Sequence, residues 1–212
     1  MSEEQKDGLK ITFIGGSGVG KTCIIKRFTT NTFDENENST TGGSYSMKMV
    51  KVGDKEVRCD LWDTAGQEKF RALGRHFYKD SYVVCLVYDI TNKESFEEIQ
   101  EVWYPDLQKN GEKYQIIGVV GNKCDLFEEE AVPEEEARKF AEEIGGVFNL
   151  VSAKKGDNIN LLFQTLVAKY LGPEFTEKLN EIKSERSPTL RIDIVEQKKQ
   201  DEIAEKKKKK CC

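Results

Sequence analysis

Histidine is nearly absent from this chain, and long apolar runs and a targeting leader are missing. The 212 residues include one histidine and six cysteines, with no Cys/His cluster at metal-ligand spacing. No apolar run approaches the roughly 18 residues that a membrane-spanning helix needs. The first residues, Met1 to Glu4, lack the basic and apolar parts of a signal peptide. These absences predict a cytosolic protein without disulfides.

Negative charges outnumber positive ones over most of the chain, and positive charge is concentrated near its end. The formal net charge is −5, although five consecutive lysines stand at Lys206–Lys210. The rest of the chain is therefore more acidic than the net value suggests. Nonspecific nucleic-acid binding requires a basic face that displaces counterions, so we expect no nucleic-acid partner.

Short apolar runs alternate with helix-length segments over residues 8–172. Strands are expected at 10–15, 44–52, 56–63, 82–89, 115–121 and 147–152, and helices at 21–30, 68–78, 93–110, 133–144 and 158–171. The runs at 82–89 and 115–121 are almost wholly apolar, which is typical of central strands covered on both faces. Gly53-Asp54 indicates a hairpin and one antiparallel edge strand. The pattern predicts a doubly wound α/β domain with a six-stranded, mostly parallel sheet and five helices, and its ligand at the carboxyl ends of the strands.

The segments outside residues 8–172 differ from the domain in composition. Residues 1–7 are predicted to be a flexible N-terminus, and Gly172-Pro173 is a strong helix terminator. The polar segment 173–212 is predicted to be a largely disordered tail, with a helix over 174–186 as the alternative.

The strongest local motif is Gly-Gly-Ser-Gly-Val-Gly-Lys-Thr at residues 15–22. It matches the eight-position phosphate loop, in which glycines let backbone N–H groups turn toward phosphates at a helix N-terminus. Lys21 would contact the β- and γ-phosphates, and the Thr22 hydroxyl would bind Mg²⁺. A glycine-rich turn before a lysine is the alternative, but the strand before the motif and the helix after it disfavour that alternative. The loop alone does not distinguish ATP from GTP.

Asn-Lys-Cys-Asp at residues 122–125 makes that distinction, because it follows the fifth strand at its carboxyl end. The carboxylate of Asp125 can accept both the N1–H and the 2-amino group of guanine. Adenine has no matching pair of donors, so such a site rejects it. On its own the tetrapeptide would be weak evidence, since Asn and Asp are common in turns.

A third motif runs from Asp60 to Glu68. Asp63 ends the third strand and would hold Mg²⁺ through its water shell. Gly66 offers an N–H to a γ-phosphate, and Gln67 can orient the attacking water. The alternative is a strand that ends in an Asp and a tight turn.

These motifs together resemble a small GTPase of the Ras superfamily, and specifically a Rab protein. The resemblance covers about residues 8–172, and Trp62–Glu68 followed by Lys69-Phe70-Arg71 is Rab-like in detail. It implies a P-loop NTPase fold and a GTP hydrolase that binds GTP or GDP with Mg²⁺.

The resemblance also assigns site residues. Phe33 would pack against guanine, Thr40 would bind Mg²⁺ and the γ-phosphate in the GTP state only, the Ala153 N–H would contact guanine O6, and Lys154 would cover the base. Effectors would contact Tyr45, Trp62 and Tyr78. The implied nucleotide-binding residues are Gly15, Ser17, Gly18, Val19, Gly20, Lys21, Thr22, Cys23, Phe33, Thr40, Gly66, Asn122, Lys123, Asp125, Ser152, Ala153 and Lys154. The implied metal-binding residues are Thr22, Thr40 and Asp63, and the implied catalytic residues are Gln67, Lys21, Thr40 and Gly66.

One segment departs from the family pattern. After Thr40 the chain continues Thr41-Gly42-Gly43-Ser44-Tyr45, which lacks two aliphatic residues and an acid. Gly43 adds backbone freedom. The altered segment should affect which effectors and exchange factors bind, and it should not affect hydrolysis. Ser17 in the phosphate loop should also leave hydrolysis intact.

No arginine is placed in the sequence as a finger in cis, so intrinsic hydrolysis should be slow and depend on an activating protein. The resemblance further implies a monomer that binds an exchange factor, effectors, a GDP dissociation inhibitor, a Rab escort protein and a geranylgeranyl transferase.

The cysteines fall into two groups. Cys23, Cys59 and Cys85 lie in apolar segments and are expected in the core. Cys211 and Cys212 end the chain like the doubly prenylated Rab terminus, and with Lys206–Lys210 they form a two-signal membrane anchor. The alternatives for the lysines are a solvated charge run or a nuclear-import patch. We expect a protein of the cytosol that is lipid-anchored on the cytoplasmic face of endomembranes or the plasma membrane.

Two other functions are alternatives to a Rab switch in vesicle traffic. One is a GTP-binding scaffold that cycles little because of its unusual 41–45 segment. The other is a Ras- or Rho-like signalling protein, which the missing Cys-a-a-X ending and the missing Rho-type insert disfavour.

Overall fold

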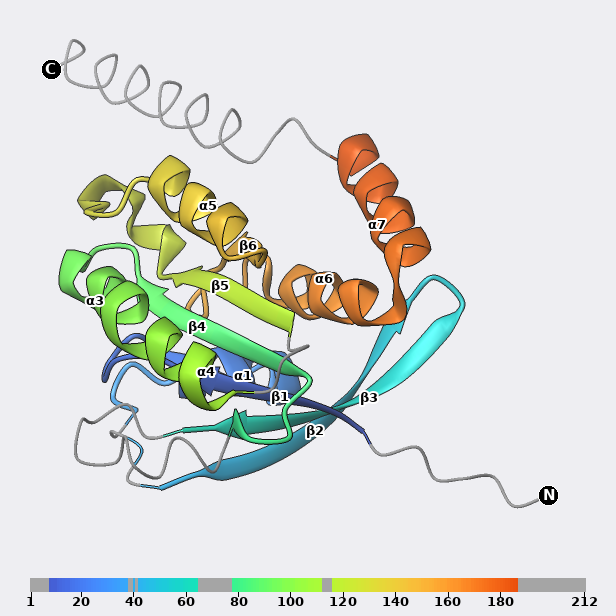
Figure 1. Cartoon of the computed structure of the whole chain (residues 1–212), viewed down its shortest axis with the longest axis horizontal. Helices are drawn as coiled ribbons and strands as arrows, with labels where there is room; N and C mark the ends of the chain where they lie inside the picture. Colours follow the sequence, from blue (N-terminus) through green and yellow to red (C-terminus); the bar gives the residue numbers. More distant parts are fainter. Residues whose placement is uncertain (1–7, 38–39, 41, 65–77, 112–115, 187–212) are drawn as a thin grey trace, which may run out of the picture.

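The computed structural model describes residues 8–37, 40, 42–64, 78–111 and 116–186, with backbone alone over 181–186. A six-stranded sheet in the order β2-β3-β1-β4-β5-β6 forms the centre (Figure 1). Its strands are β1 Leu9–Ile14, β2 Ser44–Val52, β3 Lys55–Asp63, β4 Val83–Asp89, β5 Ile116–Asn122 and β6 Val147–Leu150. β2 pairs antiparallel with β3, and all other pairings are parallel. The predicted sheet, with one antiparallel edge strand, is confirmed.

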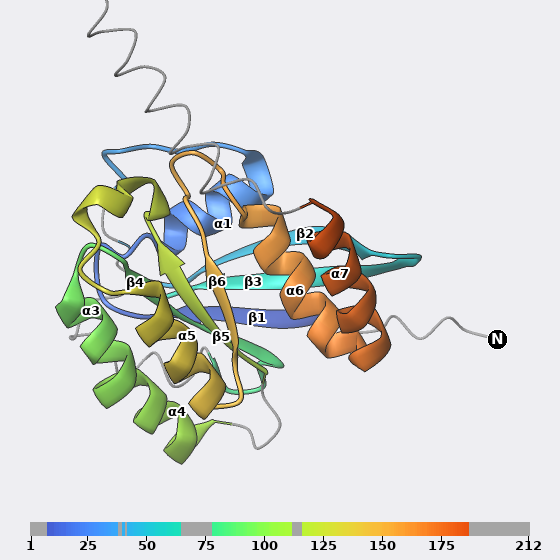
Figure 2. The same cartoon turned by 90° about the horizontal axis from the view of Figure 1, so that it is seen from above.

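Helices cover both faces of the sheet, which is why β4 is buried along its whole length. They are α1 Lys21–Thr30, α3 Lys93–Glu98, α4 Tyr104–Asn110, α5 Glu134–Glu143, α6 Ile159–Leu171 and α7 Pro173–Arg186. A π-helical segment, η2 Ile99–Trp103, joins α3 to α4, and a 3₁₀ segment, η3 Cys124–Glu129, follows β5. α1, α6 and α7 lie on one face, and α3, α4 and α5 lie on the other (Figure 2). The helix predicted at 68–78 lies outside the described residues except for Tyr78.

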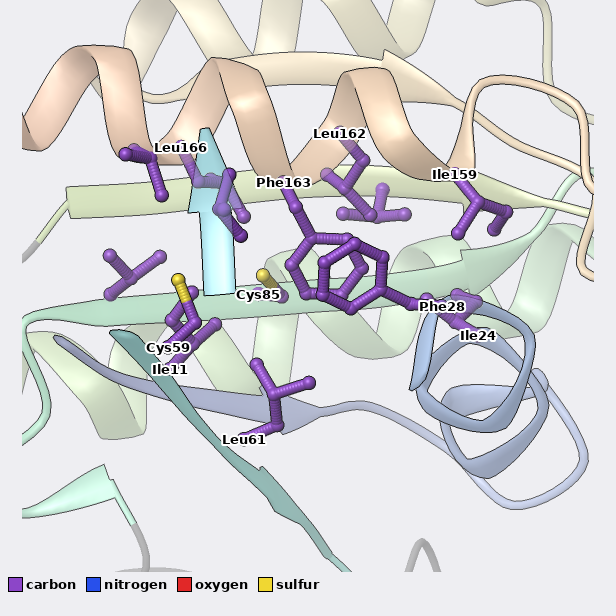
Figure 3. Packing of buried hydrophobic residues seen from close by; sticks show 14 of the residues in the cluster. Ile11, Ile24, Phe28, Cys59, Leu61, Cys85, Ile159, Leu162, Phe163 and Leu166 are labelled. Atoms are coloured by element: carbon purple, nitrogen blue, oxygen red, sulfur yellow. The ribbon is translucent and has the colours of Figure 1, made fainter. Parts of the chain in front are cut away.

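The core between the sheet and α1/α6 holds the phosphate-loop helix in place. Phe28 of α1 stacks on Phe163 of α6 with ring centroids 3.6 Å apart (Figure 3). Cys59 and Cys85 are fully buried in the same cluster, as predicted, and burial raises the pKa of the Cys59 thiol to about 12. Cys23 differs from the prediction: it is only half-buried, because its position on α1 faces the pocket described below.

The chain beyond Gly172 continues as a helix that packs on the domain. Gly172 ends α6, and Pro173 begins α7 at a position where a missing N–H costs nothing. Phe175 and Leu179, one turn apart, are buried in the core beside α6. The helical alternative for 174–186 is therefore the correct one, and this part of the tail is folded.

Candidate functional site

A cavity of about 390 Å³ opens at the carboxyl ends of the parallel strands. Its size suits a small-molecule ligand. The phosphate loop forms one end, and the segments after β5 and β6 form the other. Its lining residues are Ser17, Gly18, Gly20, Lys21, Thr22, Cys23, Phe33, Asp34, Glu35, Glu37, Thr40, Thr64, Asn122, Lys123, Asp125, Leu126, Ala153 and Lys154.

The phosphate loop requires glycine where the backbone turns sharply and passes close to a neighbour. Gly15 has φ +144°, and an added Cβ would lie 2.2 Å from the Val87 carbonyl oxygen. Gly20 has φ +94°, and an added Cβ would lie 2.3 Å from Asn122 Nδ2. α1 begins directly afterwards at Lys21, so its positive N-terminal end faces the cavity. Val19 packs in the core and contributes only its carbonyl to the contacts described below.

Lys21 is a buried cation held by backbone carbonyls. Its Nζ donates to the carbonyl oxygens of Gly15 at 2.9 Å and Gly16 at 2.7 Å. Burial lowers the pKa of Lys21 to about 8, and the nearby carboxylates of Asp63 and Glu98 partly oppose that shift. The protein groups around Lys21 therefore only partly offset the cost of burying its positive charge. An anion bound at the loop would favour the charged form of Lys21.

Three oxygen-bearing side chains converge at the base of the phosphate loop. Thr22 Oγ1 donates to Asp63 Oδ2 at 2.6 Å and lies 2.8 Å from Thr40 Oγ1. Asp63 Oδ1 is buried and accepts no hydrogen bond within the described part of the chain. Burial raises the pKa of Asp63, and the Thr22 hydrogen bond opposes the rise.

Two hydroxyls and one buried carboxylate with an unused lone pair fit Mg²⁺, which prefers oxygen ligands and keeps several waters or phosphates. No group of three or more His, Cys, Asp or Glu side chains able to hold a metal occurs in the described ranges. This finding is compatible with magnesium, because a site of this kind needs only one protein carboxylate.

Asn122 joins the phosphate loop to the segments at the opposite end of the cavity. Its Nδ2 donates to the Val19 carbonyl at 2.8 Å, and its Oδ1 accepts from the Ala153 N–H at 3.1 Å. Asn122 is 2% exposed, so its two bonds are protected from water. These two bonds hold the two motifs together beside the cavity, which Asn122 also lines.

Asp125 and Lys123 are held by side chains from other parts of the chain. Asp125 Oδ1 accepts from the Ser152 hydroxyl at 2.5 Å, which orients the carboxylate at the cavity wall. Lys123 Nζ lies 2.5 Å from Asp89 Oδ2 at the end of β4. Lys123 itself has φ +65°, so the strand turns sharply here and brings Asp125 to the cavity.

Comparisons with known proteins agree with these motifs. Residues 10–172 match the sequence model of the Ras family. The chain is 40% identical to human (Homo sapiens) Ras-related protein Rab-22A over 155 residues, which cover 73% of this chain and 79% of that protein. It is 39% identical to bovine (Bos taurus) Ras-related protein Rab-26 over 173 residues, covering 81% and 67%, respectively. It is 37% identical to human Ras-related protein Rab-30 over 172 residues, covering 81% and 84%.

This chain is a Rab-type small GTPase of the Ras family. As a Rab GTPase it hydrolyses GTP. Guanine-nucleotide and Mg²⁺ binding, a GTP-dependent switch, vesicle traffic and membrane association are general properties of this family, as are exchange factors, activating proteins, dissociation inhibitors and effectors.

Several predicted residues of the Rab protein lie outside the described residues. They are Gly66, Gln67, Thr41, Cys211, Cys212 and Lys206–Lys210. The remaining site residues border the cavity or contact those that do. Thr40 lies against Thr22 and Asp63, where the metal is expected. The Ala153 N–H donates to Asn122, so contact with guanine O6 would require it to share that hydrogen bond.

The side chain of Tyr78 of this Rab protein is buried, and its predicted contact with effectors stays a prediction. Its side chain is 1% exposed, and its hydroxyl donates to Asp106 Oδ2 at 2.6 Å within the core on the α3/α5 side. Tyr45, in contrast, is 53% exposed beside Trp62, with ring centroids 5.5 Å apart. The sequence showed an aromatic at this place but not the direction of its side chain.

Three contributors to the site were missed from the sequence. Asp89 pairs with Lys123, and its place at the end of an apolar strand could have indicated this role. Glu35 pairs with Lys154 at 2.5 Å. Arg27 binds backbone carbonyls of the loop that carries Ala153. No sequence motif indicates the Glu35–Lys154 pair or the bonds of Arg27 to backbone carbonyls.

Proposed function

We propose that this Rab protein binds GTP with Mg²⁺ in the described cavity, hydrolyses it slowly, and acts as a lipid-anchored switch in vesicle traffic. The observation that carries the proposal is the bridge made by Asn122. Through its two hydrogen bonds, Asn122 of the guanine motif touches both the phosphate loop and the segment 152–154. A single ligand that reaches both ends of the cavity accounts for this arrangement, and a guanine nucleotide has the required groups at each end.

At the phosphate end, Lys21 would donate to the β- and γ-phosphate oxygens in place of its present carbonyl partners. Thr22, Thr40 and Asp63 would hold Mg²⁺, which would supply positive charge on the β–γ bridge. The N–H groups of the glycine-rich loop and the N-terminus of α1 would stabilise further negative charge. At the base end, Asp125 would accept from guanine, while Phe33 and Lys154 would cover the ring.

In the proposed reaction, Gln67 orients a water molecule for in-line attack on the γ-phosphate. The bond from the γ-phosphorus to the β–γ bridging oxygen breaks as the water oxygen bonds to phosphorus, which gives GDP and phosphate. Thr40 and Gly66 contact the γ-phosphate only while it is present, so their segments relax after hydrolysis. No arginine is proposed as a finger in cis, so acceleration would come from an activating protein.

The proposed hydrolytic role predicts the behaviour of Gln67→Leu. Single-turnover hydrolysis of bound GTP should slow by roughly 10²-fold, a typical contribution of a group that assists proton transfer or water positioning. Gln164→Leu is the matched control, because Gln164 lies on α6, donates to the Lys51 carbonyl and is not among the residues that line the cavity, so its loss should leave the rate unchanged. Equal rates for wild type and Gln67→Leu would instead favour a GTP-binding scaffold with little cycling.

The proposed anchor consists of two prenyl groups on Cys211 and Cys212 together with Lys206–Lys210. In the part of the chain that the structure describes, no helix has both the length and the apolar character to cross a bilayer. One lipid chain binds membranes only marginally, whereas two chains or a chain with basic residues bind stably. The proposed partners are the family's exchange factors, activating proteins, dissociation inhibitor, escort protein, prenyl transferase and effectors, with Tyr45 and Trp62 on the effector surface.

Replacing both terminal cysteines with serine should move the protein from the membrane pellet to the soluble fraction of fractionated cells. The variant keeps all five lysines, so it separates the contribution of lipid from that of charge. The lysines are attracted to an anionic leaflet by about 1 kcal/mol each, and high salt screens this attraction, so a salt wash should remove a protein held by the lysines alone. Persistent pelleting after a salt wash would show that another anchor exists.

A further inference from the structure

The side chain of Arg27, on the last turn of α1, reaches the loop after β6. Its Nε donates to the Ala153 carbonyl oxygen, and its Nη2 donates to the Lys154 carbonyl oxygen, both at 2.8 Å. The guanidinium thus bonds two consecutive carbonyls of the segment proposed to contact guanine. The N–H of Ala153 is held separately by Asn122 at 3.1 Å. This residue is therefore fixed through both its N–H and its C=O.

The same guanidinium also holds the segment that leads to Phe33. Arg27 Nη1 donates to the backbone carbonyl of Asn31 at 3.0 Å and to its side-chain oxygen at 3.2 Å. Asn31 ends α1 with a left-handed φ of +56°, so the chain changes direction at this residue. The guanidinium carbon lies 5.9 Å from the centroid of the Phe33 ring, within the range of a cation–π contact.

These contacts make Arg27 the main connection between the two segments on the base side of the cavity. A second connection is the Lys154–Glu35 ion pair, whose side chains are both largely exposed. Exposed pairs contribute little because water and salt screen them. Hydrogen bonds from a charged donor are stronger, and the planar fork of arginine can serve four acceptors in fixed directions where a lysine cannot.

We infer that Arg27 is a positioning residue for the guanine base and that it sets how long a nucleotide stays bound. It does so by fixing the Ala153 backbone and the Phe33 ring relative to each other, without touching the nucleotide. The inference rests on the proposed guanine site. Loss of Arg27 should free the 153–154 segment and the 31–33 segment to move apart, which opens the base end of the cavity and leaves the phosphate end unchanged.

The test is the dissociation rate of GDP from Mg²⁺-loaded protein for wild type, Arg27→Met and Arg27→Lys. Both variants should release GDP at least tenfold faster, because neither side chain can bond two adjacent carbonyls and Asn31 together. Arg138→Met is the matched control. Arg138 bonds Glu134 at 2.6 Å and, like Arg27, has its guanidinium carbon near a phenylalanine ring, 5.0 Å from the centroid, but it lies on α5 away from the cavity. Its GDP release should stay within twofold of wild type.

A second nucleotide separates positioning from general destabilisation. In 6-thio-GDP sulfur replaces the oxygen at C6, and N1–H and the 2-amino group are retained. Wild type should release 6-thio-GDP faster than GDP, because sulfur is a weaker acceptor for the Ala153 N–H. The Arg27 variants should lose most of that difference, since the Ala153 carbonyl is then no longer held and the segment can shift its N–H out of line with the base.

Two results would overturn the inference: GDP release by the Arg27 variants within twofold of wild type, or an equal acceleration for both nucleotides with the wild-type ratio preserved. The second result would show a purely structural role. Failure of the proposed function looks different, because wild-type protein would then retain no GDP at all. If Arg27→Met does not fold, Arg27→Lys carries the same test with the positive charge kept.

Discussion

Asp125→Asn should lower the affinity for GDP by on the order of 10⁴-fold and give the protein measurable affinity for xanthosine diphosphate. The carboxylate of Asp125 can accept both guanine donors, whereas an amide places a donor against one of them and leaves a buried polar group unpaired. Xanthine has a carbonyl at C2, which can accept from that amide. Competition of the two diphosphates against a fluorescent GDP analogue measures the change.

The fold should tolerate this substitution, because the Ser152 hydroxyl that now donates to Asp125 can equally donate to the asparagine oxygen. Asp157→Asn is a suitable control, since it makes the same change in the same loop region without lining the cavity. Unchanged GDP affinity in Asp125→Asn would remove Asp125 from the base site. If Asp125→Asn lost GDP binding and gained none for xanthosine diphosphate, Asp125 would support the structure of the base site without contacting the base.

Lys21→Met should abolish the stabilisation that GDP gives the protein, yet leave the nucleotide-free fold at least as stable as wild type. GDP at about 100 times its Kd should stabilise wild type by about 2.7 kcal/mol, or a Tm rise of about 5 to 10 °C. Methionine has a similar length and lacks the phosphate-binding charge. It also removes a buried cation, whose pKa of about 8 shows that burial disfavours the charged form.

Thermal unfolding with and without GDP checks both parts of the Lys21 prediction. Lys169→Met is the matched control, because Lys169 is exposed on α6 and should keep the full GDP-dependent rise in Tm. A rise in the Lys21 variant equal to that of wild type would contradict its phosphate role. If the nucleotide-free Lys21→Met variant had a much lower Tm than wild type, the carbonyl contacts of Lys21 would more than offset the cost of burying its charge. That result would contradict the prediction.

The sheet and the motifs at its edge could be predicted because the signals are local. The β2 strand runs over Ser44–Val52 as expected, since the turn at Gly53-Asp54 fixes where β2 and β3 separate. Asn122 ends β5, so the topology alone brings it to the phosphate loop. These predictions needed only strand ends and spacing, which a sequence carries directly.

The errors came from side-chain direction and from contacts between distant parts of the chain. An aromatic residue suits a surface or a core, and the sequence did not show that Tyr78 is buried with its hydroxyl bonded to Asp106, 28 residues away. The polar composition favoured a disordered tail over 173–212, with a helix over 174–186 as the alternative, and α7 is held beside α6 by the buried residues Phe175 and Leu179. Arg27 bonds carbonyls 126 and 127 residues away, and backbone acceptors leave no trace in a sequence.

The central claim is that the cavity selects a guanine nucleotide, and displacement of a fluorescent GDP analogue by GTP and by ATP tests it most directly. In the presence of Mg²⁺, GTP should displace the analogue at concentrations close to that of the protein, whereas ATP at a roughly thousandfold excess should leave it bound, because adenine offers Asp125 no pair of donors. Displacement by ATP and GTP at similar concentrations would contradict the account.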